Sequence, residues 1–211
     1  MAKISKALLS VSDKTGIVDF AREIAKYNIQ FISTGGTARL LRENGLGLLD
    51  VSDYTGFPEM MDGRVKTLHP KIHGGLLGVR SNPEHLREMD RYNIESIDMI
   101  VVNVKNLDHT VDDDGRTCTE IMSRVDIGGI ALLRSAAKNF ESVTVIVDPT
   151  DYCTVIDDMR KNDGAVLTET NLQLAVKVFE TTAEYDRLIS DYLRQKELRS
   201  IAEKKYIEIP R

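Results

Sequence analysis

The sequence predicts an α/β fold: a three-layer, mostly parallel sheet flanked by helices, with a C-terminal helical extension. Short apolar runs alternate with segments of helical periodicity, which is typical of parallel sheets. The strongest run, residues 97–104, is apolar at nearly every position, as expected for a central strand. From residue 168 onward only helical spacing remains. We expect a single domain over residues 1–211, with an α/β core at about 1–148 and a mostly helical part at 149–211.

The first half of the chain begins with two strand–loop–helix units. Residues 7–11 form the first predicted strand, and apolar spacing predicts a helix over 17–27. A second strand at 30–32 precedes a helix over 38–44, which Gly45 ends. Residues 48–51 predict a third strand, and residues 52–61 are rich in turn formers. Repeated in this order, these units favour neighbouring parallel strands.

Residues 63–75, GRVKTLHPKIHGG, predict a polar loop beside the folded core. Pro70 disfavours helix at the residue before it, and glycines at both ends free the backbone. The Arg64 guanidinium suits phosphate or carboxylate, and Lys66 offers a point charge or an acid or base. The alternative is a solvated basic loop without a function.

The second half continues the alternation. Asn82 and Pro83 are typical of a helix start, and helices are predicted over residues 119–124, 130–139 and 150–162. Residues 143–147 predict another strand. The helical region from residue 168 is one long helix or two, whose apolar stripe serves the core or a dimer interface. Residues 204–209 predict a further edge strand.

Composition excludes several functional classes. The 211 residues carry a net charge of -5, so no nucleic-acid partner is expected and an anion site must be local. No signal peptide and no apolar stretch of membrane-spanning length is visible. The two cysteines are far apart in sequence, which favours a reducing cytoplasm. We expect no metal, because His69 and His73 lack a third ligand and Pro70 argues against a shared helix.

Two loops combine hydroxyls with glycines directly after predicted strands. The first is residues 12–16, SDKTG, and the second is residues 33–37, STGGT. Free backbone N–H groups at a helix N-terminus favour an anion, and paired glycines let a ligand approach the backbone. For the first loop the alternative is helix capping by Ser12 or Asp13. The pair of loops predicts a phosphate or other anion site.

Two further candidates follow another predicted strand, and a third lies at a predicted helix start. Asn103 and Lys105 come at the end of the strongest predicted strand, where ligands gather in open α/β sheets, although a solvated strand end is an equal alternative. Asp126 precedes Ile127, Gly128 and Gly129 at a helix start. It faces a ligand or simply caps the helix.

Six motifs, in order, resemble one family. The segments SVSDKTG at 10–16, STGGT at 33–37, GFPE at 56–59, GRVKTLHP at 63–70, DIGG at 126–129 and AAKN at 136–139 are similar to the inosine monophosphate (IMP) cyclohydrolase domain. That domain is the N-terminal part of a bifunctional purine-biosynthesis protein whose other part is a transformylase. The resemblance runs from about residue 7 to 193 and implies a methylglyoxal-synthase-like fold.

The resemblance implies a reaction and a set of site residues. The reaction closes the ring of 5-formamidoimidazole-4-carboxamide ribotide to IMP with loss of water, the last step of IMP synthesis, and needs no cofactor. It implies catalytic roles for Lys66, Asp126 and Lys138. It further implies substrate binding by Ser12, Lys14, Thr15, Ser33, Thr34, Gly35, Gly36, Thr37, Arg64 and Thr67, to which the strand-end and helix-start candidates Asn103, Ile127, Gly128 and Gly129 are added. A homodimer and a separate transformylase as supplier of the substrate are also expected.

Two features depart from the family pattern. The family has a catalytic tyrosine where this sequence has Lys105, which is carried as a candidate proton donor. Asp126 and Lys138 are twelve residues apart, about 18 Å on one straight helix. The alternatives to a cyclohydrolase are a non-catalytic, regulatory purine-ribotide-binding module on the same fold and, by fold analogy alone, a methylglyoxal-synthase-like lyase.

Overall fold

The computed structural model describes residues 3–104 and 117–207 and has a five-stranded sheet at its centre. The strand order is β3-β2-β1-β4-β5, and every neighbouring pair is parallel. Ala7 of β1 pairs with Phe31 on one side and with Met99 on the other. The strands are β1 (Lys6–Val11), β2 (Gln30–Ser33), β3 (Leu49–Asp50), β4 (Met99–Asn103) and β5 (Thr144–Ile146).

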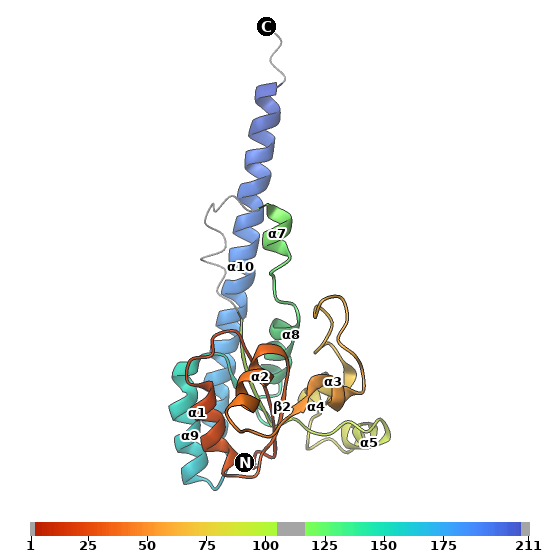
Figure 1. Cartoon of the computed structure of the whole chain (residues 1–211), viewed down its shortest axis with the longest axis vertical. Coiled ribbons are helices and arrows are strands. Elements are labelled where there is room, and N and C mark those ends of the chain that lie inside the picture. The colour runs from red at the N-terminus through yellow and green to blue at the C-terminus, as the bar shows by residue number, and fades with distance from the viewer. Residues whose placement is uncertain (1–2, 105–116, 208–211) are drawn as a thin grey trace.

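Helices connect the strands and cover the sheet, so the predicted α/β class with a mostly parallel sheet is confirmed (Figure 1). Helices α1 and α9 pack against each other, whereas α8 packs across β4, β5 and α4. The described helices are α1 (Ile17–Ala25), α2 (Gly35–Glu43), α3 (Val51–Thr55), α4 (Pro70–Leu77), α5 (Pro83–Arg91), α7 (Cys118–Met122), α8 (Gly128–Lys138), the 3₁₀ turn η1 (Pro149–Asp151), α9 (Tyr152–Lys161) and α10 (Thr168–Ile207).

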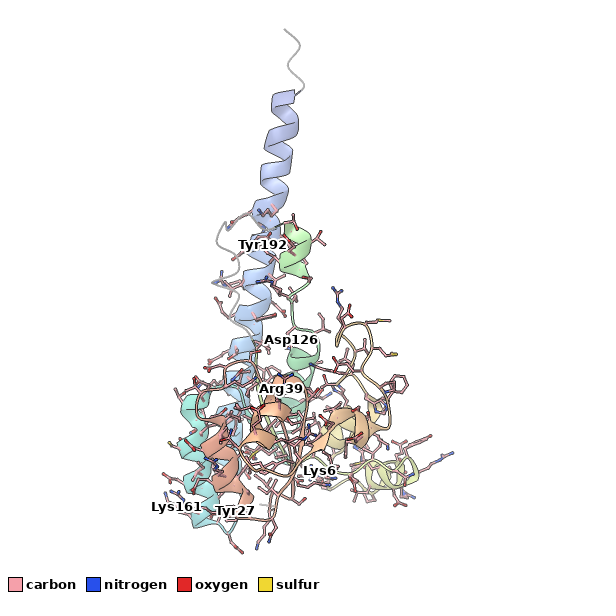
Figure 2. All side chains as sticks on the ribbon, viewed as in Figure 1. Lys6, Tyr27, Arg39, Asp126, Lys161 and Tyr192 are labelled. Carbon is pink, nitrogen blue, oxygen red and sulfur yellow. The ribbon has the colours of Figure 1, made fainter. Side chains whose placement is uncertain are left out.

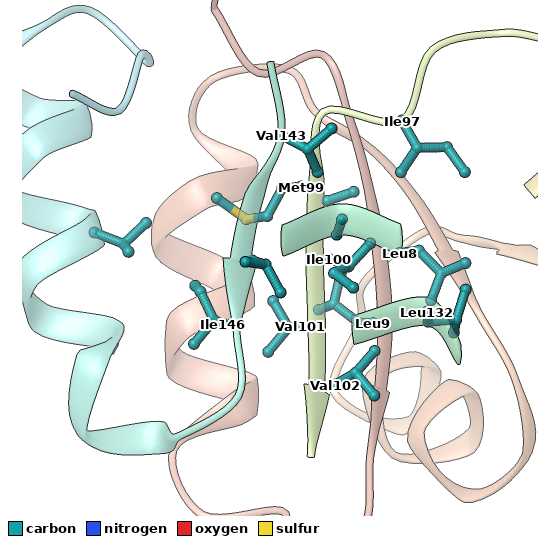
Figure 3. Close-up of a cluster of buried hydrophobic side chains, with 14 of the residues drawn as sticks. Leu8, Leu9, Ile97, Met99, Ile100, Val101, Val102, Leu132, Val143 and Ile146 are labelled. Atoms are coloured by element: carbon teal, nitrogen blue, oxygen red, sulfur yellow. The ribbon is translucent and has the colours of Figure 1, made fainter. Parts of the chain in front are cut away.

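The core lies on both faces of the central strands. Successive residues Leu8 and Leu9 of β1 are both fully buried, as are Ile100 and Val101 of β4. Neighbouring side chains of a strand point to opposite faces, so helices must cover both faces of this sheet. Figure 3 shows these side chains together with Leu132 of α8. This burial leaves the carboxyl ends of the strands as the place where polar side chains gather.

The prediction of a loop over residues 63–75 is wrong for its second half. Helix α4 begins at Pro70, and His69 caps it by accepting a hydrogen bond from the Lys71 backbone N–H at 3.1 Å. Proline suits the first helical position because its missing N–H would have no partner there. His73 therefore lies inside the helix, and only the segment before Pro70 is free to shape a site.

Two helices also begin earlier than predicted. Helix α2 starts at Gly35 instead of residue 38, and α8 starts at Gly128 instead of residue 130. The low helix propensity of glycine suggested loops, but that cost applies mainly to helix interiors. The consequence is functional, because both helix N-termini now consist of glycine N–H groups. In addition, α3 occupies part of the region predicted to be turns.

Helix α10 is a single helix of 40 residues, about 60 Å long. It packs along α8 and β5 and then extends away from the sheet (Figure 1). The Thr144 hydroxyl donates to the Asn171 side-chain oxygen at 2.8 Å, and the Arg134 guanidinium lies 5.5 Å from the centre of the Phe179 ring. The predicted edge strand at 204–209 is wrong for residues 204–207, which belong to α10. Because α10 extends away from the sheet, these residues do not lie beside either of its edges.

Candidate active site

A cavity of about 580 Å³ opens at the carboxyl ends of β1, β2 and β4. Five stretches of chain meet there: the loop after β1, the start of α2, residues 62–67, the end of β4, and the segment entering α8. The predicted site residues on its wall are Ser12, Lys14, Thr34, Gly35, Gly36, Thr37, Arg64, Lys66, Thr67, Asn103, Asp126, Ile127, Gly128 and Gly129. Segments far apart in sequence thus form one site.

The two hydroxyl-and-glycine loops are joined to each other. The Lys14 amine donates to the Thr37 hydroxyl at 3.1 Å and also to the Val11 carbonyl. Thr37 in turn accepts from the Val11 N–H at 3.0 Å and donates to the Val11 carbonyl at 3.1 Å. Burial lowers the pKa of Lys14, and the nearby Lys66 cation lowers it further while Asp13 opposes the change. A buried cation of this kind is suited to an anionic ligand.

The first loop does not cap α1 through Ser12 or Asp13. The N-cap of α1 is Gly16, whose φ of 67° is left-handed, and no side chain caps it. The Asp13 carboxylate instead accepts from the backbone N–H and the hydroxyl of Thr15, at 2.9 and 2.6 Å. These bonds lower the pKa of Asp13. The capping alternative is therefore wrong for this loop.

The basic segment approaches both glycine-led helices. A Cβ atom placed on Gly35 would lie 3.9 Å from the Lys66 amine, which puts that amine beside the N-terminus of α2. A Cβ on Gly128 would lie 2.6 Å from the Thr67 hydroxyl. The absence of a side chain at Gly128 lets the segment lie against α8, whereas its distance from Gly35 is that of an ordinary van der Waals contact. Lys66 thereby joins the anion loops to the start of α8.

Asn103 shapes the cavity from the end of β4. Its side-chain oxygen accepts from the N–H groups of Ser12 and Asp13 at 2.6 and 2.8 Å, and its amide donates to the Asp13 carbonyl at 3.1 Å. Only 8% of the residue is exposed. The alternative of a solvated strand end is therefore wrong for Asn103, whose side chain holds the first anion loop.

Asp126 lies just before α8, beside that helix in Figure 2. Its Oδ1 accepts from the Gly129 N–H at 2.8 Å, so the capping role considered from the sequence is present. Its own backbone N–H donates to the Tyr185 hydroxyl at 2.8 Å. Because Asp126 also lines the cavity, capping and ligand contact are compatible.

Three of the predicted site residues that the structure describes do not line the cavity. Thr15 is held by Asp13, and the buried Ser33 hydroxyl donates to the Leu9 carbonyl at 2.7 Å. Lys138 is exposed at the last residue of α8, opposite to the end at which Asp126 lies. A straight helix keeps its two ends apart, and this cavity is formed without Lys138. Lys105 lies outside the described residues.

Several residues that the sequence did not single out line the cavity. Arg124 does so two residues before Asp126, and Asp62 adds a second carboxylate. The position of Arg124, two residues before Asp126 and the glycines, was a sequence signal that could have marked it as a site residue. Among the described residues on the wall, four cations face two carboxylates: Lys14, Arg64, Lys66 and Arg124 against Asp62 and Asp126. The cavity is thus locally positive in a chain of net charge -5.

Residues 3–104 and 117–207 show neither a cluster of metal ligands nor a membrane-spanning helix. They contain no group of three or more His, Cys, Asp or Glu side chains that could hold a metal ion. None of the helices formed by these residues has the length and apolar character needed to cross a membrane.

A family model described as "MGS-like domain" matches residues 16–131, more than half of the chain. The chain belongs to the MGS-like domain family. Most residues that line the cavity lie within the matched region, and the methylglyoxal-synthase-like fold that we expected is confirmed. A second model, "AICARFT/IMPCHase bienzyme", matches residues 136–210 of this MGS-like chain. Its match covers the end of α8, β5, α9 and all of α10.

The MGS-like chain is also similar to two named proteins. It is 56% identical over 193 residues to the "Bifunctional purine biosynthesis protein PurH" of Magnetococcus marinus. That match covers 92% of this chain but only 36% of the relative, so the chain spans about a third of the relative's length. The crystal structure of ForH matches with a TM-score of 0.82 at 36% identity, covering 90% of this chain and 96% of ForH.

Proposed function

We propose that this MGS-like chain is an IMP cyclohydrolase, which closes the ring of 5-formamidoimidazole-4-carboxamide ribotide to IMP and releases water. The observation that carries the proposal is the cavity itself. Its lining includes Lys66, Asp126 and residues of the two joined anion loops, which supports the proposal. The similarity to PurH and the match to the AICARFT/IMPCHase model support it.

The substrate's phosphate is assigned to the two hydroxyl-and-glycine loops. The N-terminus of α2 offers the N–H groups of Gly35 and Gly36, which are favourable for an anion. Lys14 adds a cation whose pKa is already lowered by burial, so a bound phosphate would favour its charged form. Arg64 and Thr67, which also line the cavity, are assigned to the ribose and the base.

Ring closure forms one C–N bond and breaks one C–O bond. The carboxamide nitrogen adds to the formyl carbon and loses a proton, while the formyl oxygen gains negative charge and becomes a hydroxyl. That hydroxyl then leaves as water on protonation, while the former formamide nitrogen gives up its N–H proton and forms a C=N double bond to the same carbon. An amide nitrogen is a poor nucleophile, so a carboxylate that accepts its proton helps, and we assign that role to Asp126. Lys66 meets the developing oxyanion and protonates it.

Much of the rate is expected to come from positioning. Both reacting groups belong to one molecule, so holding the formyl and carboxamide groups in a reactive conformation removes an entropic barrier. The cavity walls can do this because they come from rigid strand ends and helix starts. Neither a cofactor nor a metal takes part in this scheme.

The proposal is tested by following IMP formation by ultraviolet absorbance with purified chain and the formylated ribotide. We expect turnover well above the uncatalysed rate, and a strongly reduced but measurable kcat in Lys66→Ala and Asp126→Asn variants that still fold and bind IMP by calorimetry. Binding without turnover by the unsubstituted chain would contradict the enzyme and leave a regulatory, ribotide-binding module.

We further propose a single domain that forms a homodimer in the cytoplasm. Leu172, Val176 and Phe179 are exposed at helical spacing on α10, which suits a subunit interface. Both cysteines are free, which suits a reducing compartment. A transformylase activity would supply the substrate. Light scattering at micromolar concentration tests the dimer, and a monomer mass would contradict it.

A further inference from the structure

The candidate carboxylate is fixed at two points, by two different helices. Asp126 Oδ1 accepts from the Gly129 N–H of α8 at 2.8 Å, and the Asp126 backbone N–H donates to the Tyr185 hydroxyl of α10 at 2.8 Å. The first bond sets the direction of the carboxylate. The second holds the peptide from which that carboxylate projects.

Tyr185 is well suited to accept this bond. Only 6% of the residue is exposed, so its hydroxyl has a fixed environment. Burial raises the pKa of Tyr185, with a further increase from the nearby Asp126 and Asp186 carboxylates. The phenol is therefore neutral throughout the physiological range, and the strength of the bond does not vary with pH there. A buried N–H that loses such an acceptor becomes an unpaired polar group.

We propose that Tyr185 is a positioning residue for Asp126 in ring closure. This inference rests on the proposed cyclohydrolase function. Asp126 precedes the first helical residue, so its N–H lies outside the helical hydrogen-bond ladder. Without the Tyr185 hydroxyl, the segment before α8 loses the contact that holds it against α10. The carboxylate would then lie in several positions, of which only one suits the substrate.

The Tyr185 hydroxyl can be removed without loss of the other contacts that hold α10 in place. Helix α10 is also held by the Thr144–Asn171 hydrogen bond and by the Arg134–Phe179 contact. The aromatic ring of Tyr185 fills buried space that a phenylalanine would fill equally. Removing the hydroxyl alone should therefore leave the fold intact and change the chemistry.

The test compares Tyr185→Phe with Tyr152→Phe as the matched control. Tyr152 is also buried, and its hydroxyl has no hydrogen-bond partner among the described residues. For Tyr185→Phe we expect kcat to fall about tenfold, because small displacements of a reacting group are costly. The KM for the formylated ribotide, the Kd for IMP and the melting temperature should stay near those of the unsubstituted chain. Tyr152→Phe should keep its kcat.

A double-mutant cycle identifies the route of the effect. If Tyr185 acts through the Asp126 carboxylate, Tyr185→Phe should cause no further loss of kcat in an Asp126→Asn background. A kcat for Tyr185→Phe equal to that of Tyr152→Phe overturns the inference, as do losses that multiply in the double variant. Calorimetry also gives the fraction of Tyr185→Phe chains that bind IMP. If that fraction falls by the same factor as kcat, the variant is partly unfolded, which also overturns the inference. No turnover by the unsubstituted chain overturns the proposed function itself, and this inference with it.

Discussion

The side-chain oxygen of Asn103 accepts the N–H of Ser12 at 2.6 Å, which ties the end of β4 to the loop after β1. The same side chain also accepts from the backbone N–H of Asp13 and donates to the backbone carbonyl of Asp13. The first anion loop is therefore shaped by a strand that lies about ninety residues later in the chain. Lys14, which follows these residues directly, depends on this arrangement for its place in the cavity.

We expect Asn103→Ala to lower the free energy of unfolding by about 0.5–1.5 kcal/mol, because the part-buried Asp13 N–H loses its acceptor while the Ser12 N–H keeps only the Asn103 carbonyl. Binding of IMP should weaken as well, since the loop loses its fixed shape. Urea denaturation and calorimetry measure the two effects. Asn103→Asp keeps the acceptor oxygens and should be the more stable of the two variants. An alanine variant with unchanged stability and affinity would contradict this account.

The lowered pKa of Lys14 predicts a pH dependence of anion binding. Its ordinary value is 10.5, and the folded chain without ligand releases this proton at a lower pH. IMP binding by calorimetry should therefore weaken as the pH rises from 7.5 towards 10, because the phosphate needs the charged amine. Lys14→Arg stays charged and should show a flatter profile. Equal slopes for both proteins would assign the effect to another group.

The same shift affects stability with the opposite sign. Between the folded and unfolded pKa values of Lys14, the unfolded chain binds more protons, so the contribution of this group to stability rises with pH. At pH values below both, the group is charged in either state and its burial is unfavourable. In Lys14→Met this rise should be absent, which parallel urea titrations of the two proteins can measure.

Gly129→Ala should separate activity from stability. A Cβ atom there would lie 2.5 Å from Oδ2 of Asp126, so the carboxylate must move. Alanine favours a helix over glycine by roughly 0.5–1 kcal/mol, so the fold should not be weakened much. We expect kcat to fall about tenfold or more. The control is Gly47→Ala, which meets no atom within 4 Å. A full kcat in Gly129→Ala would refute the role of the Asp126 carboxylate.

Asp98 offers a stability test at the opposite end of β4. Its carboxylate accepts from Arg80 at 2.6 Å and from the Ser5 and Lys6 N–H groups at 2.8 and 3.0 Å, and it is 6% exposed. Removing one partner of a buried ion pair costs about 3–5 kcal/mol, so Asp98→Ala should unfold at much lower urea concentration. The folded fraction should keep its kcat.

The comparison for Asp98→Ala is Glu184→Ala, which breaks an exposed pair with Arg187. Exposed pairs are screened by water and contribute little, so its urea midpoint should barely move. Similar urea midpoints for the two variants would show that the ion pair and hydrogen bonds of Asp98 contribute little to stability.

The sequence was sufficient for the sheet and for the loops of the cavity, for one physical reason. Parallel strands end at the same edge, so polar loops that follow apolar runs must come together there. It could not give the direction of each side chain. Thr15 and Ser33 lie in the predicted loops, yet their hydroxyls bond Asp13 and the Leu9 carbonyl. Such choices depend on local backbone geometry that residue type does not encode.

Tyr185 shows the other limit of the sequence. It belongs to a helical pattern that predicts only packing, and its role follows from the contact between α10 and the segment before α8. Conversely, the spacing of Asp126 and Lys138 already indicated a distance too long for one centre. The structure agrees, since the two residues lie at opposite ends of α8.

The pairing of β1 with β4 also has a kinetic consequence. Ala7 pairs with Met99, so the central contact of the sheet closes a loop of about ninety residues. The entropy of closing a loop of that length is lost before the strand pairing can stabilise the chain. Folds of high contact order therefore form slowly. During synthesis, the first anion loop emerges long before Asn103, the residue that shapes it. A growing chain should therefore gain ligand affinity late and in a single step, when β4 docks beside β1.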